Sequence, residues 1–241
     1  MTELVLAYDK SRWVGHTTDD HVLKSLVPHV AMVKIGLQLL SGHRDDAWRL
    51  NAFLRKQGVA TLQDWKLHDI GNTVAETVAN LVMNTSAVTV HASCSRHALR
   101  AVARVRDDAL GADVTDNFEL YGVTVLTDLT PDECMETYGD DPTEVVCGFA
   151  EKLIDARFDG IVCSGEELEA LARREFTKHL KTLVPGTRPS WAPADDQHRT
   201  MSYEEVAELG ATYTVVGRVV MQASDPLATL IRIREELGLP T

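Results

Sequence analysis

The sequence lacks any long apolar run. Its 241 residues contain no stretch of about 18 apolar residues, the length that a membrane-spanning helix requires. The first ten residues, MTELVLAYDK, also lack the basic region, the long apolar core and the cleavage site of a secretory signal. These absences predict a cytoplasmic protein that has no membrane partner.

Basic residues are in the minority. Lysine and arginine number 24, against 36 aspartates and glutamates, so the formal net charge is −12 at pH 7. Proteins that bind nucleic acid or an anionic membrane carry clustered Lys and Arg on one face. The charge balance therefore argues against a nucleic-acid partner.

Cysteine is scarce, and the spacings of common metal sites are missing. The four cysteines include no C-x-x-C pair, and the nine histidines form no H-E-x-x-H or H-x-H pattern. Small buried or half-buried thiols are the simpler interpretation of the cysteines. The sequence thus implies no metal ion.

Eight short apolar, β-rich segments alternate with amphipathic segments of helical length. The predicted strands are residues 4–9, 30–36, 59–65, 87–92, 121–127, 159–164, 180–186 and 212–217. Apolar strands separated by helices indicate a parallel sheet that is covered on both faces. Eight such units in 241 residues are typical of a (β/α)₈ TIM barrel, here a single domain over residues 1–241.

An open, doubly wound sheet is the alternative arrangement of such units. Its usual dinucleotide-binding fingerprint, G-x-G-x-x-G after the first strand, is absent, and YDKSRWVGH occupies that place. The pattern therefore favours the barrel.

Charged side chains follow the third predicted strand. In QDWKLHDIGNT, residues 63–73, Asp64, Lys66 and Asp69 come directly after the apolar run GVATL. Residues two apart on a strand point to the same side, so Asp64 and Lys66 are expected to face the same space. Buried charges are costly unless they are paired, so this cluster is either a structural ion network or a working site.

Other predicted strands also end in ionisable groups. Asp9 ends the first strand, Lys34 the second and His91 the fourth. A barrel of this kind builds its active site at the carboxyl ends of its strands, so all these groups are expected on one rim. Each alone could be a core ion pair, a snorkelling lysine or a cap, but their convergence favours a functional site.

The segments after the last two strands predict a phosphate site. Loops at this end of the fold frequently bind phosphate, and here they comprise residues 185–200 and 215–220. Gly217 allows backbone N–H groups to approach an anion, and Arg218 supplies a fork of donors. Gln197 could reach across from the first loop, whose length suggests a lid.

Four Ser/Thr-x-x-Glu segments predict helix capping boxes. They are TVAE at 73–76, TPDE at 130–133, SGEE at 164–167 and SYEE at 202–205. Thr73 and Thr130 are therefore candidate caps as well as candidate ligand contacts.

The segment DWKLHDIGNT resembles the D-x-K-x-x-D-I-x-N-T signature of the orotidine 5′-phosphate decarboxylase family. Further short segments match in order and spacing, namely AYD, VKIG, VHA, VLTDLT, DGIVCS, PG followed by DDQHRT, and VVGR. The resemblance covers nearly the whole chain. It implies a homodimeric barrel that forms UMP from orotidine 5′-phosphate, in the last step of pyrimidine synthesis, without metal or organic cofactor.

The resemblance also assigns catalytic roles by motif position. It implies that Lys66 donates a proton to pyrimidine C6 and that Asp64 faces the substrate carboxylate. Lys34 and Asp9 would hold the ribose hydroxyls and complete the charge chain. Asp69 would cross the dimer interface into the partner's site.

Further substrate contacts are implied by the same resemblance. Ile70 and Thr73 would lie near Asp69, Thr130 would contact the pyrimidine amide, and Pro185 would lie beside the ring. The phosphate would be bound by Gln197, Gly217 and Arg218.

The chain departs from the family pattern at two places, and other interpretations stay open. Gly71 stands where the family commonly has proline, and HASCS replaces a more glycine-rich segment. A Mg²⁺-dependent 3-keto-L-gulonate 6-phosphate decarboxylase shares the D-x-K-x-x-D core but typically has Glu where this chain has Lys34. A catalytically silent barrel that binds a nucleotide is the third possibility.

Overall fold

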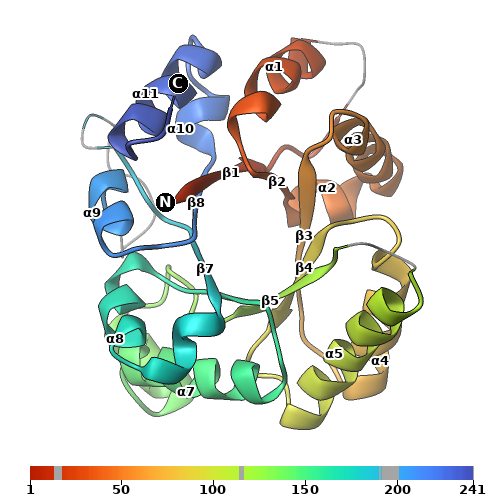
Figure 1. Ribbon diagram of the computed structural model, residues 1–241, viewed down its shortest axis with the longest axis vertical. Helices are drawn as coiled ribbons and strands as arrows, with labels where there is room; N and C mark the ends of the chain where they lie inside the picture. The colour runs from red at the N-terminus through yellow and green to blue at the C-terminus, as the bar shows by residue number, and fades with distance from the viewer. Residues whose placement is uncertain (14–17, 114–116, 190, 192–200, 241) are drawn as a thin grey trace.

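Eight parallel strands form a closed barrel with helices around it (Figure 1). The computed structural model describes residues 1–13, 18–113, 117–189, 191 and 201–240. Each strand pairs in parallel with the next in the sequence, and β8 pairs with β1 to close the barrel. The predicted (β/α)₈ fold is confirmed, and the open-sheet alternative is wrong.

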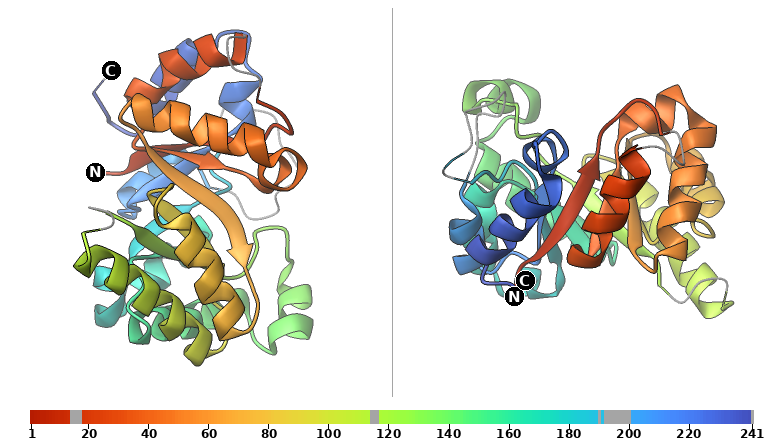
Figure 2. Two further views of the ribbon diagram at one scale, coloured as in Figure 1. Left: turned by 90° about the vertical axis from the view of Figure 1, so that its right-hand side faces the viewer. Right: turned by 90° about the horizontal axis from the view of Figure 1, so that it is seen from above.

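All eight predicted strands are present. They are β1 Glu3–Tyr8, β2 Met32–Ile35, β3 Ala60–Leu67, β4 Ala87–His91, β5 Glu119–Val123, β6 Gly160–Val162, β7 Lys181–Val184 and β8 Tyr213–Val216. Most end one to four residues earlier than the sequence suggested. The exception is β3, the long orange arrow in the left view of Figure 2, which continues two residues further.

The helices form the outer layer of the barrel. The α-helices are α1 Thr18–Leu26, α2 Leu37–Gly42, α3 Arg44–Lys56, α4 Gly71–Leu81, α5 Arg96–Gly111, α6 Pro131–Tyr138, α7 Pro142–Asp155, α8 Leu168–Ala172, α9 Tyr203–Glu208, α10 Arg218–Met221 and α11 Pro226–Glu236. Three 3₁₀ turns are η1 Val27–His29, η2 Gly165–Glu167 and η3 Glu175–His179. No helix in the described part of the chain is both long and apolar enough to cross a membrane.

Apolar side chains fill two layers, one inside the barrel and one between strands and helices. On β1, Leu4, Leu6 and Tyr8 pack outward against helices, whereas Val5 points into the barrel. The interior cluster is small and consists of Val5, Met32, Leu62, Ala87, Tyr121 and Leu183. Because side chains alternate along each strand, the next inward-facing position lies two residues further towards the carboxyl end of the strand. Those positions are available for the charged residues of the rim.

Three of the four predicted capping boxes are confirmed. Thr130, Ser164 and Ser202 each accept a backbone N–H at the start of a helical segment. The box at 73–76 is wrong, since α4 already begins at Gly71 and Thr73 lies inside it. Its Glu76 instead accepts a hydrogen bond from the Asn72 side chain at 2.9 Å.

Candidate active site

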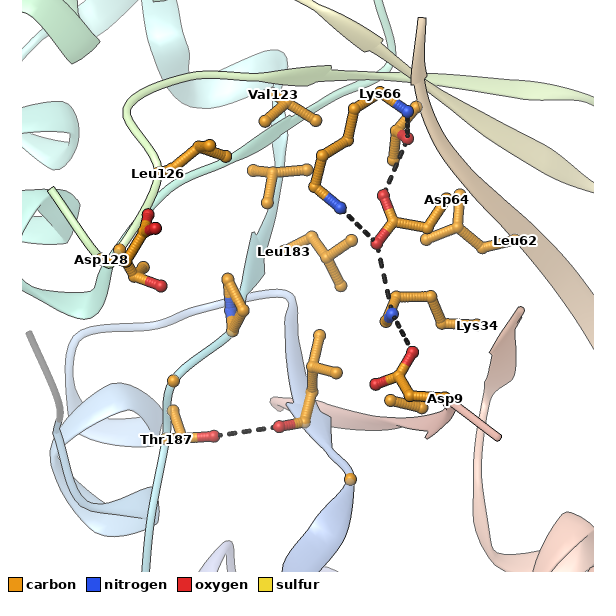
Figure 3. Close-up of a pocket in the computed structure, with 18 of the residues that line it drawn as sticks. Asp9, Lys34, Leu62, Asp64, Lys66, Val123, Leu126, Asp128, Leu183 and Thr187 are labelled. Carbon is orange, nitrogen blue, oxygen red and sulfur yellow. Dashed lines mark hydrogen bonds and ion pairs between the residues drawn. The ribbon is translucent and has the colours of Figure 1, made fainter. Parts of the chain in front are cut away.

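A cavity of about 600 Å³ opens at the carboxyl ends of the strands (Figure 3). Every strand contributes at least one lining residue: Ala7, Lys34, Leu62, Thr89, Val123, Val162, Leu183 and Val215. Four charged lining residues lie on β1 to β3 or just beyond β1, and three follow β5, β7 and β8. This is the end of the barrel at which the fold places active sites.

Four predicted residues form a continuous chain of alternating charge on one wall of the cavity (Figure 3). Lys34 Nζ lies 3.0 Å from Asp9 Oδ1 and 3.2 Å from Asp64 Oδ2. Lys66 Nζ lies 2.8 Å from the same Asp64 oxygen. One carboxylate oxygen therefore serves two ammonium groups, and the order along the wall is Asp9, Lys34, Asp64, Lys66.

Pairing keeps the inner members of this chain charged. Burial by itself would lower the pKa of Lys34, but the carboxylates of Asp64 and Asp9 outweigh it and raise that pKa above its ordinary value. Burial would likewise raise the pKa of Asp64, but Lys34, Lys66 and a hydrogen bond from Thr89 outweigh it and lower that pKa. Both groups are thus ionised at neutral pH.

Asp9 lies just beyond β1. Its carboxylate pairs with Lys34 and lies close to the backbone of Gly36. A Cβ atom at Gly36 would come within 2.0 Å of Asp9 Oδ1. Glycine is therefore required at this position in order to leave room for the carboxylate.

Lys66 has an unusual backbone conformation. Its φ is +48°, in the left-handed region that residues other than glycine seldom adopt. The pairing of β3 with β4 is irregular at the same place, between Gln63 and Leu67. Such local strain costs about 1–3 kcal/mol and is concentrated at functional sites, where a bulge re-aims a side chain.

The turns after β7 and β8 also contribute to the cavity lining, and two arginines are among their residues. Pro185, Arg188, Gly217 and Arg218 all line it. Gly186 between them has φ of +79°, a left-handed turn that favours glycine. Arg188 and Arg218 make the lining after β7 and β8 the cationic end of the cavity.

The predicted contacts at the β3–α4 loop do not line this cavity among the described residues. Asp69 and Thr73 are exposed, and the Ile70 side chain is 73 % exposed. Thr130 also lies outside the lining, and its hydroxyl caps α6 instead. Gln197 lies outside the described residues.

His91 ends β4, as predicted, but it is not among the described residues of the cavity wall. Its Nδ1 accepts the Ser93 backbone N–H at 3.3 Å, and its ring lies 5.6 Å from that of His68. Burial, followed by the charges of His68, Lys152 and Lys66, lowers the pKa of His91 to about 4. His91 is therefore neutral at pH 7.

Sequence reasoning missed six polar residues of the wall: Thr89, Thr127, Asp128, Thr187, Arg188 and Gln222. Thr127 and Asp128 belong to the quoted segment VLTDLT, where Thr130 was preferred. Arg188 stands three residues after Pro185, inside the loop already chosen for phosphate. Thr127, Asp128 and Arg188 each lie four or five residues after the end of a strand, so a place in the loop that follows a strand was the available signal.

The described part of the chain holds no group of three or more His, Cys, Asp or Glu side chains placed to bind a metal ion. Two carboxylates of the cavity, those of Asp9 and Asp64, are instead paired with lysines.

A family model described as "Orotidine 5′-phosphate decarboxylase / HUMPS family" matches residues 16–233. The chain belongs to this family. Two of its relatives, both called orotidine 5′-phosphate decarboxylase, come from Saccharophagus degradans and Pseudomonas fluorescens. The first is 35 % identical over 90 % of this chain and 88 % of the relative. The second is 34 % identical over 92 % of this chain and 94 % of the relative.

A solved structure of the same family shares the fold throughout. The orotidine 5′-phosphate decarboxylase of Lactobacillus acidophilus superimposes with a TM-score of 0.78 at 25 % identity. The match covers 99 % of this chain and 100 % of that one. Family membership and fold thus agree over essentially the same residues.

Proposed function

We propose that this chain is a carboxy-lyase that converts orotidine 5′-phosphate to UMP, the last step of pyrimidine synthesis. The alternating chain Asp9–Lys34–Asp64–Lys66 on the cavity wall carries the proposal. Decarboxylation at C6 needs a fixed cation at a carbon that becomes an anion, and Lys66 is the cation at the end of that chain. The family membership of the chain supports the same reaction.

The proposed substrate lies across the cavity from its cationic end to Lys66. Arg218 and the backbone at Gly217 would bind the phosphate, with Gln197 as a further donor and Arg188 close by. Charge-assisted and bidentate bonds make arginine well suited to phosphate. Lys34 and Asp9 would then hold the ribose hydroxyls, and Pro185 would flank the base.

The chemistry needs only a positioned ammonium group. The C6–carboxylate bond breaks, carbon dioxide leaves, and the electron pair stays at C6 in the ring plane, where no carbonyl group can delocalise it. The Lys66 ammonium stabilises this charge more than it stabilises the distributed charge of the substrate, and then donates its proton to C6. The resulting amine regains a proton from water, so the enzyme is unchanged after each turnover.

Asp64 has two parts in this proposal. It holds Lys66 at 2.8 Å and keeps it aimed into the cavity. It would also face the substrate carboxylate, where two negative charges 4 Å apart repel by about 4 kcal/mol at an effective dielectric constant of 20. Loss of carbon dioxide relieves that repulsion, which favours the transition state over the bound substrate.

We further propose that two copies of the chain form a homodimer in which Asp69 enters the partner's site, with Ile70 and Thr73 beside it. Asp69 and Thr73 are exposed, and none of the three lines the cavity of its own chain. The 73 % exposed Ile70 would be covered if the β3–α4 loop is an interface between the two copies.

The proposed enzyme needs no metal or organic cofactor and acts in the cytoplasm. The four cysteines are buried free thiols, which fits a reducing compartment. A lysine at the end of β2 fits a metal-free charge chain, because Lys34 occupies the space between two carboxylates that a cation would otherwise fill.

The direct test follows the ultraviolet absorbance of orotidine 5′-phosphate after purified protein is added in the presence of EDTA. Turnover to UMP that persists in EDTA is expected, since Lys66 supplies the positive charge. A parallel reaction with 3-keto-L-gulonate 6-phosphate and Mg²⁺ is expected to show none. No UMP formation would contradict the proposal, and turnover of the sugar phosphate would favour the Mg²⁺-dependent relative. UMP binding without turnover would indicate a silent barrel.

Mixed dimers test the placement of Asp69. Lys66→Ala and Asp69→Ala proteins are each expected to be nearly inactive, but equal amounts exchanged together should regain about a quarter of wild-type activity. Half of the dimers are then mixed, and each mixed dimer has one complete site, as counting over a two-fold symmetric dimer requires. No recovery after confirmed subunit exchange would place Asp69 in the site of its own chain.

A further inference from the structure

Thr89 lies on β4, beside the part of the neighbouring strand β3 that contains Asp64 and Lys66. Its side chain is buried and lines the cavity. We propose that the Thr89 hydroxyl is a positioning residue that fixes both the backbone of Lys66 and the carboxylate of Asp64 for proton transfer. This inference rests on the proposed decarboxylase function and extends it to a residue outside the charge chain.

The pairing of β3 with β4 leaves a gap that Thr89 fills. Gln63 pairs with Val88 and Leu67 pairs with Val90, so the segment 64–66 of β3 faces the single residue Thr89 of β4. A regular ladder would give each buried N–H a carbonyl partner. In this bulge the Lys66 N–H instead donates to Thr89 Oγ1 at 2.8 Å.

The same hydroxyl donates its proton to the catalytic carboxylate. Thr89 Oγ1 lies 2.9 Å from Asp64 Oδ1, whereas Lys34 and Lys66 share Oδ2. A hydroxyl has one proton and two lone pairs, so accepting from Lys66 and donating to Asp64 are compatible. Thr89 therefore decides which carboxylate oxygen faces the two lysines.

These two bonds account for the left-handed conformation of Lys66. With φ of +48°, Lys66 turns back so that its Nζ reaches the carboxylate only two residues earlier in the chain. Strained conformations of this kind persist only where the surroundings hold them. The bond from the Lys66 N–H to Thr89 holds the backbone there, independently of the side-chain ion pair.

Other buried threonines have different partners. Thr124 donates to the Val162 carbonyl, and Thr187 bonds to Thr214. Among the buried threonines that the structure describes, Thr89 alone bonds to an ionised side chain. A purely structural hydroxyl would resemble Thr124, which makes Thr124 a matched control.

The experiment compares Thr89→Val, Thr89→Ser and Thr124→Val with the wild type. Thr89→Val keeps the shape but removes the hydroxyl, and kcat for orotidine 5′-phosphate is expected to fall about 100-fold, the scale for a misplaced catalytic group. KM and the Kd of UMP should stay within about threefold, because the phosphate end is untouched. Thr89→Ser should restore kcat to within about threefold, and Thr124→Val should leave it unchanged.

The pH profile separates positioning from simple destabilisation. Asp64 faces Lys34 from β2 and Lys66 from β3, with Asp9 behind Lys34, and none of these charged groups is removed in Thr89→Val. Loss of the donor at Oδ1 should raise the pKa of Asp64, since that bond helps to lower it. The acid limb of kcat/KM should therefore move to higher pH in Thr89→Val and not in Thr124→Val.

Each outcome of these experiments either supports the role of Thr89 or contradicts it. Wild-type kcat and an unmoved acid limb in Thr89→Val would overturn it, as would a loss of activity that Thr89→Ser does not restore. If Thr89→Val does not fold, Thr89→Ala takes its place. If the wild type itself does not form UMP, the proposed function fails, and crystal structures of both proteins then test Thr89 separately. The inference would stand if Lys66 left the left-handed region only in the variant, and it would fail if φ did not change.

Discussion

Replacement of Lys66 by alanine is expected to lower kcat for orotidine 5′-phosphate by at least about 10⁴-fold, the upper range for loss of a general acid. The Lys66 side chain is 34 % exposed, lines the cavity and ends the charge chain, so its ammonium group is the cation expected to reach a bound base. Its charge acts on the anion that forms at C6, which exists only after the carboxylate has begun to leave. The loss should therefore appear in kcat and not in substrate affinity.

Two measurements define this result. Absorbance loss of orotidine 5′-phosphate gives kcat, and calorimetric titration with UMP should give a Kd within about tenfold of the wild type, because the phosphate end remains intact. Lys178→Ala is the control, since Lys178 pairs with Glu175 on the surface, away from the cavity. Residual kcat above about a hundredth of wild type in Lys66→Ala would contradict a proton-donor role.

Replacement of Asp64 by asparagine is expected to cost both activity and stability. Lys34 and Lys66 would lose their shared counter-charge and be left as two cations around one neutral amide. Breaking a buried ion pair in this way destabilises proteins by about 3 kcal/mol or more. We expect a loss of about 3 kcal/mol here, because Lys66 is partly in contact with water. We expect kcat to fall by about 10³-fold, since the charge and the aim of Lys66 are both altered.

The stability difference should depend on pH in a defined direction. The pKa of Asp64 is lowered in the folded chain, so its charge stabilises the fold above the pKa of the unfolded chain, and this stabilisation is lost as the pH falls through the folded pKa. The pKa of Lys34 is raised, so its contribution is present below the unfolded value and lost as the pH rises through the folded one. Thermal unfolding should thus separate wild type from Asp64→Asn most clearly near neutral pH, with convergence in acid.

Asp46→Asn is the matched control for Asp64→Asn. Asp46 is also buried and bonded to two cations, Arg12 at 2.8 Å and Arg49 at 3.0 Å, but it lies outside the cavity. It should lose stability and keep kcat. If the Asp64→Asn protein behaved in the same way, with reduced stability and unchanged kcat, Asp64 would have only a structural role as an ion-pair partner.

Much of the site was accessible from sequence because the fold turns chain order into spatial order. In a parallel barrel every strand ends at the same rim, so charges that follow apolar runs must converge. That rule alone places Asp9, Lys34, Asp64 and Lys66 together. The arginine after β8 follows from the same rule, and Arg218 does line the cavity.

Sequence rules failed where a tertiary contact competes with a local one. The TVAE segment satisfies the capping-box pattern, but Glu76 is engaged by Asn72 and α4 starts earlier, at Gly71. At the end of β5 the motif drew attention to Thr130, whereas the wall is formed by Thr127 and Asp128. Residue type could not decide between them, because the point at which the chain leaves the barrel axis depends on packing of the loop.

By itself, the sequence determined the barrel, the order of its strands and the rim on which the charges gather, because apolar periodicity and strand alternation are local properties of the chain. Only the tertiary structure decided how Lys66 is held. In the bulge, residues 64–66 of β3 lie opposite Thr89 of β4. It arises from the mismatched pairing of two separate strands, and no local pattern at Lys66 or at Thr89 predicts it. The hydrogen bonds of one strand depend on its neighbour, so the left-handed turn at the proposed proton donor had to be seen rather than inferred.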